Sequence, residues 1–142
     1  MPFILDTDHL IVIQRRAESL YERLRERMSR HRPVNFHLTV VSFHEQMMGA
    51  NVLISRANNP TQIVRGYQLM EATLQDFSRF RVLPFDEVAS QEFVRLRQER
   101  VRIGTMDLRI AAIALAHQMT VLTRNLRDFA QVPDLRIEDW TV

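Results

Sequence analysis

The chain has 142 residues, of which 46% are hydrophobic and 25% are charged, the balance of a single globular domain over residues 1–142. It contains no cysteine, which excludes a disulfide scaffold, thiol catalysis and a thiolate zinc site. All 19 basic residues are arginine, which excludes a Walker-type phosphate loop and Schiff-base chemistry, and the net charge of +2 is too small for a broad polycationic field.

Short apolar runs alternate with amphipathic stretches along the chain. The apolar spacing predicts these elements in order: a strand over 3–5, a helix capped by Asp8 ahead of Leu10, a helix over 17–30, a strand over 36–41, a helix through 47–52, a helix from Pro60 with Ile63, Tyr67, Met70 and Leu74 as its apolar face, a strand at 82–83, a helix over 87–100, a helix over 106–117, a strand over 120–123 and an edge strand over 135–137. Such alternation predicts an α/β fold with a parallel sheet covered on both faces.

No apolar run approaches the roughly 18–20 residues of a membrane span, and the N-terminus lacks the charged-then-apolar pattern of a signal peptide. We therefore expect a cytoplasmic protein without membrane contact. The pattern leaves open whether Met47, Met48 and the 63–74 face pack in the core or across a dimer.

Acidic residues stand at three junctions that a parallel sheet would bring to one edge. Asp6 ends the first strand, Glu45 is expected in the first turn of the helix after the second strand, and Asp107 is expected in the first turn of the helix before the fourth. An all-oxygen ligand set suits Mg²⁺ or Mn²⁺, which lowers the pKa of a bound water and stabilises charge on a phosphate. The pattern favours hydrolysis of phosphodiester bonds.

Most of these acids also have a purely structural interpretation. The spacing Ser42-x-x-Glu45 matches a capping box, Asp8 fits a helix N-cap, and Asp107 would complement a helix dipole. Asp6 is harder to explain in this way, because strands disfavour aspartate and no cap is expected at that position.

Four segments, taken together, resemble the PIN-domain toxins of the VapC type, and they follow one another in the family's order over essentially the whole chain. The segments are the opening Ile4-Leu5-Asp6-Thr7-Asp8-His9-Leu10, the stretch 41–49 in which Glu45 precedes Gly49 by four residues, the stretch 103–114 around Asp107, and the C-terminal stretch 122–129 with Val132-Pro133 and Glu138-Asp139-Trp140 beyond it.

The resemblance implies a three-layer α/β/α fold around a central, mostly parallel sheet. It also implies a metal-dependent endoribonuclease that cuts tRNA or another structured RNA, forms a homodimer, and acts as the toxin of a toxin–antitoxin pair, silenced by its antitoxin. By motif match, Asp6, Glu45 and Asp107 would bind Mg²⁺ or Mn²⁺.

Further site residues follow from the same match. Many PIN domains carry a fourth acid where this chain has Asn125, so Asn125 and Asp128 are both candidates for the fourth catalytic position. Thr7 and Arg124 are candidate substrate contacts. Thr7 would offer its hydroxyl beside the acids, and the Arg124 guanidinium would bind a phosphate of the substrate.

Three alternatives remain at this point. Asp6-Thr7-Asp8 after an apolar strand also fits a phosphatase of the haloacid dehalogenase type or a response-regulator receiver, but both place a lysine near the phosphoryl group and this chain has none. A degraded PIN-like module that only binds RNA or an antitoxin would account for Asn125. The three intact acids argue against that alternative.

Overall fold

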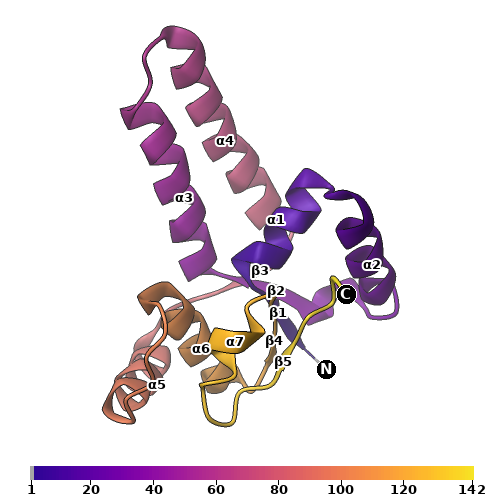
Figure 1. Cartoon of the computed structure of the whole chain (residues 1–142), viewed down its shortest axis with the longest axis vertical. Coiled ribbons are helices and arrows are strands. Elements are labelled where there is room, and N and C mark those ends of the chain that lie inside the picture. Colours follow the sequence, from indigo (N-terminus) through magenta and orange to yellow (C-terminus); the bar gives the residue numbers. More distant parts are fainter. Residues whose placement is uncertain (1) are drawn as a thin grey trace.

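The computed structural model describes residues 2–142 as alternating strands and helices around one sheet (Figure 1). The elements are β1 Phe3–Leu5, α1 Thr7–Arg15, α2 Glu18–Met28, a short 3₁₀ helix Pro33–Asn35, β2 Phe36–Thr39, α3 Val40–Ser55, α4 Pro60–Ser78, β3 Arg81–Leu83, α5 Glu87–Gln98, α6 Thr105–His117, β4 Thr120–Leu122, α7 Leu126–Phe129 and β5 Ile137–Glu138.

The five strands form one parallel sheet in the order β3-β2-β1-β4-β5. The central strand β1 pairs with both β2 and β4, with Phe3 opposite Phe36 on one side and opposite Thr120 on the other. Because all the strands run in one direction, the residues that follow β1, β2 and β4 meet at the same edge of the sheet. The α/β prediction is confirmed.

The strands place alternate side chains into two separate cores, one on each face of the sheet. Ile4 and Val121 pack with α5 and α6 around Ile110 and Ile113. Phe3, Leu5 and Leu122 pack on the opposite face with α1 and α2, around Leu10 and Leu24. The predicted three layers, helices over both faces of a sheet, are therefore confirmed.

Helices α3 and α4 form a long antiparallel hairpin that extends away from the sheet (Figure 1). Its apolar face was predicted correctly as a stripe, but the stripe does not enter the core: Ile63, Tyr67 and Leu74 are 42%, 58% and 62% exposed. Met48 on α3 is also exposed. At the base of the hairpin, Phe77 of α4 joins the α1–α2 core and Val41 of α3 joins the α5–α6 core.

Several predicted strand boundaries are wrong, and helix capping explains the change in the second strand. The second strand ends at Thr39 rather than Val41, because the Thr39 side chain accepts a hydrogen bond from the backbone N–H of Ser42 and starts α3 at Val40. The edge strand is Ile137–Glu138 rather than 135–137. Within residues 2–142, no helix combines the length and apolar character that crossing a membrane requires.

Candidate active site

Asp6 stands at the C-terminal end of the central strand and begins the next helix. It is the N-cap of α1, where its Oδ1 accepts a hydrogen bond from the Thr7 backbone N–H at 2.8 Å. The predictions that Asp8 caps this helix and that no cap is needed at Asp6 are therefore wrong; Asp8 lies in the helix's first turn. Although it is a carboxylate, Asp6 is only 5% exposed.

The second carboxylate oxygen of Asp6, Oδ2, faces Thr123, the first residue after β4. The Thr123 hydroxyl lies 2.8 Å from Asp6 Oδ2 and 3.2 Å from Asp8 Oδ2, and its single hydrogen can serve only one of them. Burial, followed by the nearby charges of Asp8 and Asp107, raises the pKa of Asp6 to about 7, against the lowering effect of the Thr123 hydrogen bond.

Asp8 is fixed by a network that the sequence alone did not reveal. Its Oδ2 accepts the Arg124 backbone N–H at 2.9 Å, and its Oδ1 lies 2.8 Å from Nδ1 of His9. The fully buried His9 ring accepts the Trp140 backbone N–H at Nε2, which leaves Nδ1 protonated and donating to Asp8. The C-terminal segment is thereby joined to the strand-end acids.

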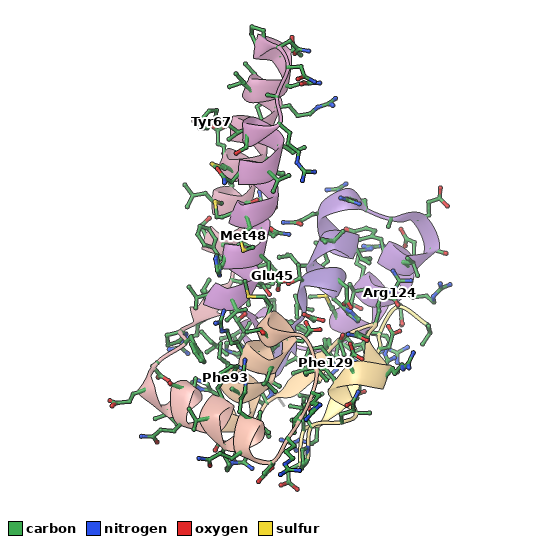
Figure 2. All side chains as sticks on the ribbon, turned by 60° about the vertical axis from the view of Figure 1, so that its left-hand side comes forward. Glu45, Met48, Tyr67, Phe93, Arg124 and Phe129 are labelled. Atoms are coloured by element: carbon green, nitrogen blue, oxygen red, sulfur yellow. The ribbon has the colours of Figure 1, made fainter. Side chains whose placement is uncertain are left out.

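Glu45 reaches the same edge from α3. It lies in the second turn of this helix, not the first, and the capping-box interpretation is wrong because Thr39, not Ser42, caps α3. The Thr7 hydroxyl is 2.9 Å from Glu45 Oε1 and 2.9 Å from the Ser42 hydroxyl. Figure 2 shows Glu45 at the base of the hairpin, with Met48 and Tyr67 further out.

Asp107 enters from the first turn of α6, as predicted. The Asn125 side-chain amide donates to Asp107 Oδ2 at 3.3 Å and to Asp128 Oδ2 at 3.0 Å, so the candidates for the fourth position lie side by side next to Asp107. Burial, and then the charge of Glu45, raises the pKa of Asp107. The structure thus brings Asp6, Glu45 and Asp107 into one electrostatic cluster.

The acid cluster has the donor chemistry of a divalent-cation site. Carboxylates that raise one another's pKa in a partly buried place are relieved by a hard cation, and oxygen ligands suit Mg²⁺ or Mn²⁺. In residues 2–142 no three Asp, Glu or His side chains are drawn together tightly enough to count as a finished ligand set. Instead, the acid oxygens face neighbouring hydroxyls and amides, as expected for like charges that repel one another.

Comparison with known proteins identifies the family of this chain. The PIN domain family matches residues 3–135. The tRNA(fMet)-specific endonuclease VapC of Salmonella typhimurium is 30% identical over 99% of this chain and 98% of the relative. The chain is a PIN domain of the VapC type. Membership of this family excludes the phosphatase and receiver interpretations of Asp6-Thr7-Asp8. Members of the VapC type are metal-dependent ribonucleases.

Solved structures of VapBC complexes share the fold of this PIN domain over its full length. VapBC-1 from nontypeable Haemophilus influenzae matches with a TM-score of 0.78 and 25% identity over 100% of both chains. DNA-bound VapBC from Salmonella typhimurium matches with a TM-score of 0.72 and 26% identity over 99% of this chain and 98% of that one.

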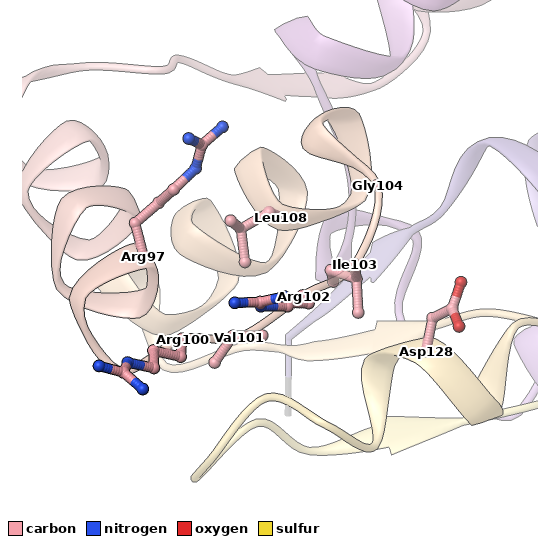
Figure 3. A pocket seen from close by; sticks show the side chains of 8 residues that line it. All are labelled: Arg97, Arg100, Val101, Arg102, Ile103, Gly104, Leu108 and Asp128. Carbon is pink, nitrogen blue, oxygen red and sulfur yellow. The ribbon is translucent and has the colours of Figure 1, made fainter.

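An arginine-lined cavity adjoins the acids of this PIN domain. It encloses about 600 Å³ at the α5–α6 connection, with Arg97, Arg100 and Arg102 around it and Asp128 across from them (Figure 3). Within the described residues none of these three arginines forms an ion pair. The sequence gives no sign of this cavity, because nothing local shows that the connection folds back toward Asp128.

The predicted substrate contacts lie in different settings. Thr7 sits among the acids, held between Ser42 and Glu45. Arg124 is exposed at the rim of the acid cluster, and the cluster contacts it through its backbone N–H rather than its guanidinium. Its side chain is therefore free to meet a ligand from solution.

Proposed function

We propose that this PIN domain is a metal-dependent endoribonuclease and the toxin of a toxin–antitoxin pair. The observation that carries the proposal is the convergence of Asp6, Glu45 and Asp107, from three separate elements, at the C-terminal edge of a parallel sheet. Relatives carry names such as tRNA(fMet)-specific endonuclease VapC and ribonuclease VapC2, which supports RNA as the substrate class, tRNA or another structured RNA in particular. The cytoplasm, where such RNA is found, is the proposed place of action.

Asp6, Glu45 and Asp107 would hold Mg²⁺ or Mn²⁺. When bound, the cation supplies the positive charge that lowers the pKa of the attacking water and offsets charge on the phosphate. Asn125 and Asp128 stand beside Asp107, where the Asn125 amide separates the two carboxylates and keeps Asp107 oriented.

The remaining residues around the cluster position the acids and the substrate. Thr7 fixes the rotamer of Glu45, and Thr123 fixes Asp6 against the end of β4. Arg124 at the rim and the arginines of the 600 Å³ cavity would bind phosphates of the RNA strand where it extends beyond the acid cluster. A guanidinium suits this role because it donates two parallel hydrogen bonds to a phosphate.

The partners proposed for this chain are an antitoxin and a second copy of the chain. The solved relatives are VapBC complexes, which supports an antitoxin partner. The exposed apolar stripe on α3 and α4, including Met48, Tyr67 and Leu74, is of the kind that a homodimer interface buries.

Incubation of purified protein, freed of co-purified inhibitor, with total cellular RNA tests the activity. Wild type should release discrete fragments with Mg²⁺ or Mn²⁺ and none with excess EDTA, while Asp6→Asn should be inactive although folded. Asp86→Asn is the matched control, because Asp86 is likewise an N-cap carboxylate but lies at α5. Cleavage that survives in Asp6→Asn would contradict the site, and intact RNA in every lane would favour the degraded binding module.

A further inference from the structure

A groove runs from the acid cluster along the inner side of the hairpin. It encloses about 470 Å³ between α1, α3 and α4, with Thr7 and Glu45 at one end. Thr7, Ile11 and Arg15 line it from successive turns of α1, and at about 1.5 Å rise per residue they span about 12 Å. The groove is therefore long enough to hold the chain segment next to a phosphate at the acids.

A glycine of α3 lines this groove and has no role in packing. Gly49 is in a helix interior, where glycine is less favourable than alanine, and a Cβ there would meet no atom of the protein within 4 Å. Gly66 of α4 differs, because a Cβ there would overlap the Ile54 side chain, so the contact between α3 and α4 explains it. At Gly49 the fold leaves the helix backbone open to whatever enters the groove.

The wall of the groove carries a polar pair with unused hydrogen-bonding capacity. Gln14 and Gln46 exchange two hydrogen bonds at 3.0 and 2.8 Å, and Gln14 Nε2 also donates to Asp76 Oδ2 at 3.0 Å. Both N–H groups of Gln14 are thus used, while Gln46 keeps one N–H and Asp76 keeps acceptor capacity. A donor beside an acceptor is the pattern that a nucleobase edge complements.

We propose that this groove is a nucleotide subsite that takes the base next to the scissile phosphate. Gln46 and Asp76 read the edge of the base, Gly49 lets the nucleotide approach the α3 backbone, and Arg15 meets the following phosphate. Proteins read single-stranded RNA by hydrogen bonds to such unpaired base edges, and the volume lies in the range of small-ligand pockets. The inference rests on the proposed ribonuclease function, and it assigns the choice of the base beside the cut to Gln46 and Asp76.

Filling the groove from Gly49 tests the proposal without touching the acids. Gly49→Leu should cut kcat/KM on total cellular RNA at least tenfold, with Mn²⁺ binding unchanged and an unfolding temperature no lower than wild type. Gly49→Ala should stay within about threefold of wild type, because a methyl group occupies little of the groove. Asn51→Leu, which adds the same side chain on the same helix at an exposed position outside the groove, is the control.

Base reading is tested separately by Gln46→Met, which keeps the length of the side chain but removes its amide. Mapping the cleaved ends by sequencing should show that the base preference at one position flanking the cut relaxes, while cleavage persists. Equal rates for wild type and Gly49→Leu, or an unchanged preference in Gln46→Met, would refute the subsite alone.

Other outcomes separate the subsite from the proposed function and from a peptide occupant. Intact RNA with the wild-type protein would refute the ribonuclease itself and the subsite with it. A Gly49→Leu variant that cleaves RNA normally but escapes inhibition by the co-expressed antitoxin would assign the groove to a peptide and overturn the proposal.

Discussion

Replacing Asp6 with asparagine should stabilise the metal-free protein while abolishing its activity. The amide introduced at position 6 keeps an oxygen for the Thr7 backbone N–H and places an N–H against the Thr123 hydroxyl. That hydroxyl then has its one hydrogen free for Asp8. Every hydrogen bond of the site is retained, and the buried negative charge is removed.

The magnitude follows from the pKa of Asp6. The folded protein raises this pKa from 3.8 to about 7, so it keeps a proton over a pH range in which the unfolded chain has lost it. The contribution to stability is full below pH 3.8 and is lost as the pH rises to about 7. At about 1.4 kcal/mol for each pH unit, ionised Asp6 costs the wild type roughly 4 kcal/mol above pH 7, and Asp6→Asn avoids this cost.

Chemical denaturation in EDTA between pH 4.5 and 8.5 measures the effect. The free energy of unfolding of Asp6→Asn minus that of wild type should grow with pH and level off above pH 7. The Asp86→Asn control removes an exposed N-cap carboxylate, and its curve should stay parallel to that of wild type. Mn²⁺ at pH 8 should stabilise wild type more than Asp6→Asn, because the variant binds the cation more weakly. A difference that does not vary with pH would refute the account of Asp6.

Two further predictions concern single buried contacts. His9→Asn keeps a donor near Asp8 and loses the acceptor for the Trp140 backbone N–H, whereas His9→Gln does the reverse. Each variant loses one buried hydrogen bond, so both should lower the free energy of unfolding by about 1–3 kcal/mol in urea melts, and a wild-type value in either would contradict the hydrogen bonding assigned to His9. Gly66→Ala should lower the unfolding temperature, because the added methyl group overlaps Ile54. Gly49→Ala should raise the free energy of unfolding by about 0.5–1 kcal/mol, because its methyl group meets no atom and alanine is the better helix residue. Calorimetry that shows a change in stability of the same sign for both variants would contradict the packing of the hairpin.

The strands and their parallel arrangement could be predicted because the information is local. Phe3–Leu5 and Thr120–Leu122 are short apolar runs separated by helices, and parallel pairing follows from that alternation. The edge at which Asp6 and Asp107 meet then follows from topology. The capping assignments failed because Thr39 and Asp6 each cap a helix that begins directly after a strand, with no loop to mark the boundary.

The missed features depend on contacts between distant residues. His9 and Trp140 are 131 positions apart, and nothing in the segment around His9 indicates that its ring meets the C-terminal backbone. The exposed stripe of the hairpin has the periodicity of a core helix, and periodicity alone cannot distinguish a core from an uncovered face. The arginine cavity likewise exists only because the α5–α6 connection turns back toward Asp128.

The most direct test of the central claim is calorimetric titration of Mn²⁺ into the metal-free protein at pH 7.5. The account predicts binding to wild type and to Asp86→Asn, and a loss of at least tenfold in affinity for each of Asp6→Asn, Glu45→Gln and Asp107→Asn, because each removes one carboxylate from a shared site. Mn²⁺ affinity that is the same in wild type and in all three variants would contradict the assignment of these acids as the metal-binding centre.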